Sequence, residues 1–253
     1  MFFDSHAHLN DERFNEDRDE LIASFKQHGI CNVVNIGADL QTSKESIELS
    51  EKYDFIYAAV GVHPHDVEEM TDADLDTLSG MSKHEKVVAI GEIGLDYYYD
   101  NSPRELQRKW FRTQLELANN LNLPVIIHSR DAMGDTLEIL KDCPVKAGVL
   151  HCYSGSVESA KEILKLGYYI SFAGPVTFKN AKGLTEVARF VPMDKILIET
   201  DCPYLAPEPY RGKRNSSLYV PEVAKKIAEL KGITVEEIAK ATKENTKRLF
   251  GIK

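Results

Sequence analysis

The chain has 253 residues, 43% of them hydrophobic and 28% charged, so it can bury a sizeable core beneath an ordinary soluble surface. Its formal net charge is −9, from 31 basic and 40 acidic residues, which argues against a protein that coats nucleic acid by neutralising phosphates. This balance still permits an enzyme that binds one chain end in a small cleft.

No apolar run approaches the ~20 residues that span a bilayer. Residues 1–20 contain acidic side chains and no hydrophobic signal segment. The four cysteines form no C-x-x-C pair. We therefore expect a cytoplasmic protein with reduced thiols, no membrane association and no obligate protein partner.

Short apolar, β-branched-rich runs recur along the chain at intervals suited to βα units. The pattern predicts eight strands, at residues 2–4, 32–36, 56–61, 87–90, 125–128, 148–151, 168–172 and 195–198. Among the segments between them, 103–121 is the clearest predicted helix, because Pro103 suits a first turn and four large apolar side chains keep helical spacing. Further helices are predicted at 157–166, 221–230 and 235–249.

Eight strands alternating with helices, without a linker or low-complexity tract, are typical of a (β/α)8 TIM barrel. We expect one α/β domain spanning residues 1–253, with its active site at the C-terminal ends of the strands. A doubly wound open sheet is the alternative. No glycine-rich phosphate-binding loop follows the first strand, which favours the barrel.

The first strand leads into His6 and His8. Strand side chains alternate between faces, so two histidines separated by one residue point to the same side. A divalent cation shared by the two imidazoles would explain the pair. A hydrogen-bonded core pair is the alternative.

Titratable side chains also follow most of the other strands. Six of the eight histidines lie just past strands 1, 3, 5 and 6. Beyond the first strand, the residues of this kind are His63, His65, Glu92, Asp96, His128, Arg130, His151, Glu199 and Asp201. A single histidine at a strand end is more often a hydrogen-bonded surface group, but the joint placement favours a metal site.

Four imidazoles and two carboxylates suit a site for two divalent cations. We expect Glu92 to bridge both cations with its two oxygens, and Asp201 to bind a cation and orient a proton. The expected terminal nitrogen ligands are His6, His8, His128 and His151. Such mixed ligands suit Zn, Mn, Fe, Co or Ni, and Mg, which prefers oxygen and water, is a further candidate.

An ordered set of motifs along the whole chain resembles the TatD family of metal-dependent deoxyribonucleases, within the amidohydrolase-like (β/α)8 superfamily. The motifs are Asp4-Ser-His-Ala-His, Gly61-Val-His-Pro-His, Gly91-Glu-Ile-Gly-Leu-Asp-Tyr, His128-Ser-Arg-Asp-Ala, His151-Cys-Tyr-Ser-Gly, Glu199-Thr-Asp-Cys-Pro-Tyr-Leu-Ala-Pro, Arg211-Gly-Lys-Arg-Asn and Asn245-Thr-Lys-Arg-Leu-Phe. The resemblance implies a divalent-cation-dependent deoxyribonuclease of the 3′-5′ exonuclease type, with DNA as substrate. It places the metal ligands at the same six positions. One departure is Ser216-Ser217 after Asn215, where the family commonly has Glu-Pro, so local substrate contacts can differ.

The mechanism expected from these residues is attack of a metal-activated hydroxide on phosphorus. Asp201 is the expected proton acceptor and Glu92 the catalytic bridging carboxylate. Asp4 and Glu199 are expected to face inward below their ligands, with Asp4 orienting a metal-bound histidine. The sequence identifies no partner for Glu199.

Five further residues are expected to contact the substrate: His63, His65, Arg130, Tyr153 and Arg214. A guanidinium at Arg130 can clamp a phosphate through two hydrogen bonds. A structural cap is the alternative for His63 and His65, and a solvated loop is the alternative for Arg214. The run 97–99, three tyrosines, offers stacking faces for bases.

Two other functions are compatible with such a site. One is a metal-dependent hydrolase of a non-nucleic-acid ester or amide, but many such enzymes bridge their metals with a carboxylated lysine, and Glu92 stands at that strand end here. The other is a metal-binding protein that has lost catalysis, against which the complete ligand set argues.

Overall fold

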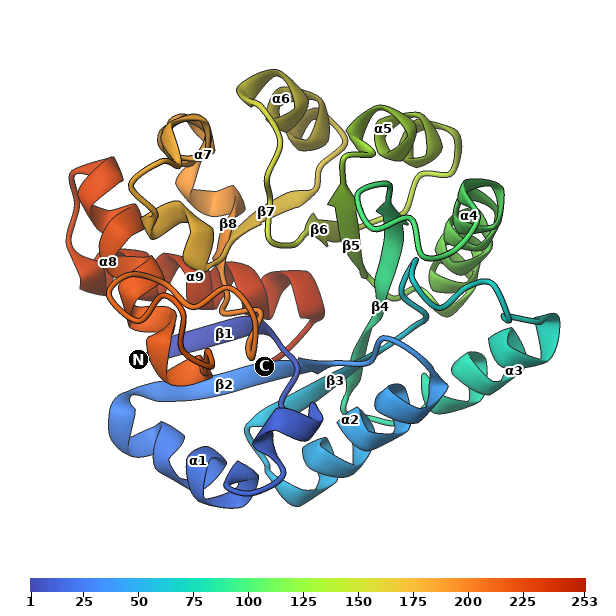
Figure 1. The fold of residues 1–253 in the computed structure, drawn as a ribbon, viewed down its shortest axis with the longest axis horizontal. Coiled ribbons are helices and arrows are strands. Elements are labelled where there is room, and N and C mark those ends of the chain that lie inside the picture. Colours follow the sequence, from blue (N-terminus) through green and yellow to red (C-terminus); the bar gives the residue numbers. More distant parts are fainter.

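The computed structural model describes all residues, 1–253. Eight parallel strands form one sheet in the order of the sequence. They are β1 (Phe2–Ala7), β2 (Ile30–Ile36), β3 (Ile56–Val60), β4 (Val87–Asp96), β5 (Val125–Arg130), β6 (Gly148–Leu150), β7 (Tyr169–Phe172) and β8 (Ile196–Ile198). Figure 1 shows them inside a ring of helices, which excludes the doubly wound alternative and confirms the predicted barrel.

The helices alternate with the strands. They are α1 (Arg18–Ser24), α2 (Leu40–Lys52), α3 (Asp72–Met81), α4 (Arg104–Leu121), α5 (Met133–Asp142), α6 (Val157–Lys165), α7 (Lys182–Phe190), α8 (Val220–Lys231) and α9 (Val235–Phe250). Short 3-10 turns are η1 (Glu12–Phe14), η2 (Phe25–His28), η3 (Gly174–Thr177), η4 (Met193–Lys195) and η5 (Ser217–Tyr219). No helix combines the length and the apolar character that a membrane span requires.

The seam between the last and the first strand closes just beyond the end of β8. The backbone N–H of Asp201 donates to the carbonyl of His6 at 2.9 Å, and the N–H of His8 donates to the carbonyl of Cys202 at 2.8 Å. Ala7 and Cys202 form a parallel bridge. Three predicted site residues therefore lie on the backbone that closes the barrel.

The predicted strands are all present, and four of them extend further than their patterns indicated. β2 begins earlier, at Ile30, and β5 ends later, at Arg130. β1 runs on through His6 to Ala7, and β4 continues through Glu92 to Asp96. Both contain irregular pairing, between Asp4 and Ala7 in β1 and between Ile90 and Ile93 in β4. The irregularities hide the alternation that marks a strand in sequence.

Side chains are packed in two layers. The outer layer lies between the strands and the helices. The inner layer takes residues from every strand and from the end of α9: Phe3, Val34, Ile36, Ala59, Val88, Ala89, Ile126, Val149, Tyr169, Leu197, Leu249 and Phe250. This apolar filling is why the polar cluster is confined to the other end of the barrel.

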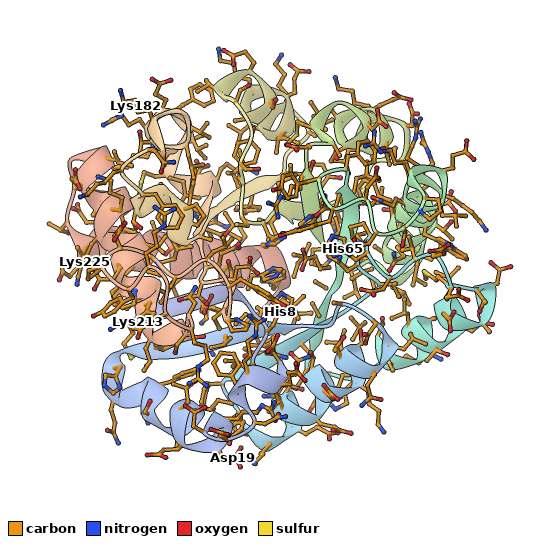
Figure 2. All side chains as sticks on the ribbon, in the orientation of Figure 1. His8, Asp19, His65, Lys182, Lys213 and Lys225 are labelled. Atoms are coloured by element: carbon orange, nitrogen blue, oxygen red, sulfur yellow. The ribbon has the colours of Figure 1, made fainter.

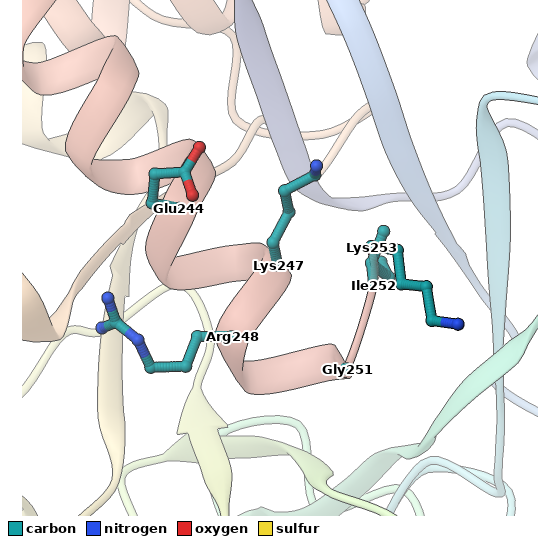
Figure 3. Close-up of a pocket in the computed structure, with 6 residues that line it drawn as sticks. All are labelled: Glu244, Lys247, Arg248, Gly251, Ile252 and Lys253. Atoms are coloured by element: carbon teal, nitrogen blue, oxygen red, sulfur yellow. The ribbon is translucent and has the colours of Figure 1, made fainter.

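The end of α9 lies at the amino-terminal ends of the strands, because the Asn245 side chain donates to the carbonyls of Met193 and Ile196 at the start of β8. Figure 3 shows a shallow hollow there, lined by Glu244, Lys247, Arg248, Gly251, Ile252 and Lys253. It is separated from the histidines by the inner apolar layer.

We predict that Phe3→Ala lowers the free energy of unfolding by ~3–5 kcal/mol, because it removes a fully buried ring from the inner layer. Phe190 is an exposed phenylalanine at the end of α7, and Phe190→Ala is the matched control, with an expected change within about 0.5 kcal/mol. Urea unfolding measures both. Equal losses would contradict the assignment of the inner layer.

Candidate metal centre

The six predicted ligands converge at the carboxyl ends of the strands. They come from five strand ends: His6 and His8 from β1, Glu92 from β4, His128 from β5, His151 after β6 and Asp201 after β8. Glu92 and His151 are almost fully buried. Figure 2 labels His8 and His65, which lie toward the middle of the ring of helices.

One group of ligand atoms surrounds Oε2 of Glu92. The Nε2 atoms of His6 and His8 are 3.2 Å apart, and they lie 3.3 and 3.6 Å from that oxygen. Oδ1 of Asp201 lies 3.6 and 3.5 Å from the same two nitrogens. Four atoms bound tetrahedrally at 2.0–2.1 Å would be about 3.3–3.4 Å apart, so these spacings fit one cation.

A second group surrounds the other oxygen of Glu92. Oε1 lies 2.7 Å from Nε2 of His151, 2.8 Å from Nδ1 of His128 and 3.5 Å from Nε2 of His63. The two nitrogens of His128 and His151 are 3.2 Å apart. His63, expected only as a substrate contact, thus lies within reach of a metal bound by Glu92 and His128.

Two buried carboxylates orient the histidines of the second group. Glu199 lies 3.3 Å from Nδ1 of His151 and accepts the backbone N–H of Cys152 at 2.7 Å. Asp96 lies 3.0 Å from Nε2 of His128 and 3.0 Å from Nε2 of His65. In both cases the ring nitrogen on the side away from Glu92 meets an oxygen, which fixes the ring and turns the other nitrogen toward a metal.

Burial and the neighbouring charges act against each other within the cluster. Burial lowers the pKa of His151, but Glu92 and Glu199 outweigh it and hold that pKa well above its ordinary value. Burial raises the pKa of Glu92, but His151 and His63 outweigh it and hold that pKa well below the usual range. For His63 burial dominates and lowers the imidazole pKa. The two carboxylates therefore favour the protonated form of His151.

Comparison with known proteins extends over the whole chain. A family model described as TatD related DNase matches residues 3–251. A protein of Bacillus subtilis (strain 168) named uncharacterized metal-dependent hydrolase YabD is 52% identical over 100% of both chains. The 3′-5′ ssDNA/RNA exonuclease TatD of Pectobacterium carotovorum subsp. carotovorum (strain PC1) is 32% identical over 98% of each chain.

The chain belongs to the TatD-related DNase family. The crystal structure of the TatD homolog YJJV from Escherichia coli K12 superposes with a TM-score of 0.93 at 32% identity, covering 100% of this chain and 98% of that one. Family membership and the ligand set together make the chain a metal-dependent hydrolase.

The contacts of Asp4 differ from the expectation, although it belongs to one of the TatD motifs. Its carboxylate accepts the backbone N–H of Thr200 at 2.9 Å and the Thr200 hydroxyl at 2.6 Å, and it contacts no histidine ring. Its one contact with a candidate ligand is at the backbone of His6, whose N–H donates to the Asp4 carboxylate at 3.4 Å, so the expected hydrogen bond to a histidine ring is not formed. The irregular pairing after Asp4 breaks the alternation on which that expectation rested. Glu199 forms such a bond instead.

The expected substrate contacts divide into two sets. His63, His65 and Arg130 lie at the mouth of the metal centre, beside Glu92 and Asp96. Tyr153 is buried and its hydroxyl donates to the carbonyl of Ser156 at 2.8 Å. Arg214 donates to Asp17 at 2.8 Å and to the carbonyl of Arg13 at 2.7 Å. Tyr153 and Arg214 remain predictions, and the proposals below do not depend on them.

The Ser-Ser pair that replaces the common Glu-Pro of the TatD family is buried. Ser216 accepts the N–H of Leu218 at the start of η5, and Ser217 packs 3.9 Å from the sulfur of Cys202. Neither side chain is available to a substrate, since both are at most 6% exposed. The departure therefore affects packing under the loop after β8.

We predict that Glu92→Gln lowers the number of divalent cations bound per chain, because an amide retains one carbonyl oxygen and cannot supply an oxygen to each group. Metal analysis after dialysis against Zn²⁺ or Mn²⁺ measures the number. Glu158→Gln, on the exposed side of α6, is the control and should bind as many cations as the unchanged chain. An undiminished number in Glu92→Gln would contradict the bridging role.

We predict that cation binding releases protons and strengthens as the pH rises. The raised pKa of His151 means that its imidazole is protonated below that pKa and must lose the proton to ligate. Titration calorimetry in two buffers of different ionisation enthalpy measures the protons released. Identical heats in the two buffers would refute the prediction.

Proposed function

We propose that this chain is a two-cation phosphodiesterase that degrades nucleic acid, with single-stranded DNA as substrate and a 3′-5′ exonuclease mode. The observation that carries the proposal is that Glu92 stands between two groups of candidate ligands. One of its oxygens faces His6, His8 and Asp201. The other faces His128, His151 and His63. The relative named 3′-5′ ssDNA/RNA exonuclease supports the substrate. A cytoplasmic location is part of the same proposal.

The protein's own residues then have separate tasks. Bound divalent cations supply a water of lowered pKa and neutralise charge that develops on the phosphoryl group. Asp201, whose carboxylate lies within 3.6 Å of both His6 and His8, is placed to accept the proton of the attacking water. Glu92 fixes the spacing of the two groups of ligands.

Hydrogen-bond donors for the phosphate lie next to the second group. Arg130 ends β5 two residues after His128, on the strand that pairs with β4. A guanidinium there can donate to two phosphate oxygens. His63 and His65 lie on the same side of the centre, with their Nε2 atoms 3.5 Å from Glu92 and 3.0 Å from Asp96.

End-labelled oligonucleotides test the function. Single-stranded DNA, single-stranded RNA and blunt duplex, each labelled at the 5′ or the 3′ end, are incubated with the chain and with Zn²⁺, Mn²⁺, Co²⁺, Ni²⁺ or Mg²⁺ in turn. We expect stepwise shortening of 5′-labelled single-stranded DNA. Hydrolysis of an ester or amide panel with intact oligonucleotides would replace the proposal with the alternative hydrolase.

We predict that Asp201→Asn lowers kcat by ~10²–10⁴-fold, because the amide cannot accept a proton. The amide oxygen can still ligate, so metal content should fall far less than turnover. Steady-state kinetics on the single-stranded substrate and metal analysis of the same preparation give the two quantities. Retained turnover would remove Asp201 from the role of proton acceptor.

A further inference from the structure

Exposed apolar side chains gather around the mouth of the metal centre. Of the six large apolar residues that are exposed, four lie in the two loops after β4 and β8: Tyr98, Tyr99, Tyr204 and Leu205. These strands are four positions apart in a ring of eight, so the loops lie on opposite sides of the mouth (Figure 1). Exposed aromatic side chains grouped in this way mark a binding surface.

The first patch consists of Tyr98, Tyr99 and Arg130. The two rings meet edge to face, with centroids 4.9 Å apart at 89°, and the guanidinium of Arg130 lies 4.0 and 4.7 Å from their centroids. Both rings remain more than half exposed. Tyr99 also touches His65 edge to face at 5.5 Å.

The backbone of this patch is tied to the metal centre. Oδ1 of Asp96 accepts the N–H groups of Tyr98 and Tyr99 at 3.0 and 2.9 Å, while Oδ2 bonds the ring of His128. One buried carboxylate therefore fixes both the patch and a candidate ligand.

The second patch consists of Tyr204, Leu205 and Arg13. The guanidinium of Arg13 lies 4.2 Å from the Tyr204 centroid and is held by two hydrogen bonds to Asp11. The ring of His8 meets Tyr204 edge to face at 6.0 Å. This patch borders the first group of ligands, as the other patch borders the second.

Tyr204 is fixed relative to Asp201. Its N–H donates to the Asp201 carbonyl at 2.9 Å, and its own carbonyl accepts the Asn215 side chain at 2.6 Å. The loop cannot move away from the metal centre without breaking both bonds.

We propose that the two patches are base-stacking faces, which hold unpaired nucleotides on the two sides of the phosphodiester that is cleaved. This proposal rests on the proposed function. Exposed tyrosine rings stack on any base. Arg130 adds a positive charge for the adjoining phosphate at the first patch, whereas Arg13 at the second patch is already paired with Asp11. Bases in a duplex have both faces covered, so such patches select single strands without selecting sequence.

The overall charge of the chain makes short-range contacts necessary. At −9 the protein repels a polyanion at long range, and it cannot gain affinity from a basic groove. Stacking is independent of charge and of salt screening. It therefore supplies affinity that does not depend on long-range electrostatic attraction.

Binding measured without cleavage tests the stacking faces. The Asp201→Asn protein, loaded with Mn²⁺, is titrated into 5′-fluorescein oligothymidylate and followed by anisotropy. Two further variants are made in this Asp201→Asn background: one carries Tyr98→Ala together with Tyr99→Ala, and the other carries Tyr204→Ala. Each should weaken binding by about tenfold, which corresponds to ~1.4 kcal/mol. Phe190→Ala, an exposed aromatic residue at the opposite end of the barrel, should leave binding unchanged. Tyr204→Phe should retain it.

Oligonucleotides with one abasic position locate the contacts. An abasic site on one side of the cleaved bond should weaken binding to the protein that retains Tyr204. If Tyr204 stacks on the base that is missing, the same abasic site should not weaken binding to the Tyr204→Ala variant any further. Metal content of each variant separates stacking from damage to the metal centre. Unchanged binding in both patch variants, or equal binding of blunt duplex, would overturn the proposal.

Cleavage by the unchanged chain distinguishes this proposal from the proposed function. Tight, tyrosine-dependent binding without hydrolysis of any oligonucleotide would support the stacking faces and refute the phosphodiesterase. If the unchanged chain does hydrolyse the oligonucleotide, kcat/KM is also measured for methyl p-nitrophenyl phosphate, a small ester that carries no base. The ratio of kcat/KM for the oligonucleotide to kcat/KM for the small ester should fall about tenfold in the patch variants. An unaltered ratio would overturn the stacking faces alone.

Discussion

The buried carboxylate of Glu92 is the interaction on which the rest of the site depends. It lies within 3.6 Å of five imidazoles, those of His6, His8, His63, His128 and His151. Protonating all five rings would place several positive charges within a few ångströms of one another, and neutral rings packed this closely gain little from one another. Binding of the proposed divalent cations would resolve the conflict, because they would replace protons on the rings and turn the opposed nitrogen atoms into ligands.

A second set of buried carboxylates keeps these ligands in place. Glu199 and Asp96 each join a histidine to the backbone of a loop, Glu199 through Cys152 and Asp96 through Tyr98 and Tyr99. Asp4 ties β1 to Thr200 next to the barrel seam. The position of the metal centre is thus coupled to the closure of the barrel and to the loops around its mouth, so the fold, the ligands and the aromatic rim form one connected structure.

The chain combines an acidic surface with a site suited to an anionic substrate. Cations neutralise the cluster locally, and the arginines at the mouth, Arg13 and Arg130, are both stacked on exposed tyrosines. Attraction then operates over a few ångströms only. A substrate that brings both a phosphate and an aromatic base satisfies this arrangement, whereas an amide or a simple ester uses only the cations. This difference favours nucleic acid over the other hydrolase substrates.

The barrel and the convergence of the six ligands could be predicted from the amino-acid sequence alone. Each ligand follows a strand pattern, and parallel strands in a closed ring converge at their carboxyl ends.

The sequence did not reveal which buried side chains contact one another. The contact of Asp96 with His128 joins neighbouring strands, and that of Asp4 with Thr200 crosses the barrel seam. The contact of Glu199 with His151 reaches from the end of β8 past β7 to the end of β6. These contacts also depend on pairing irregularities in β1 and β4, where simple alternation misplaces a side chain. Tyr204 belongs to the motif that begins at Glu199, but the motif does not reveal its contacts, because only the folded loop brings it against His8 and Arg13. Local periodicity encodes the strands, but the partners of buried charges are decided by the tertiary structure, since they join residues up to 196 positions apart.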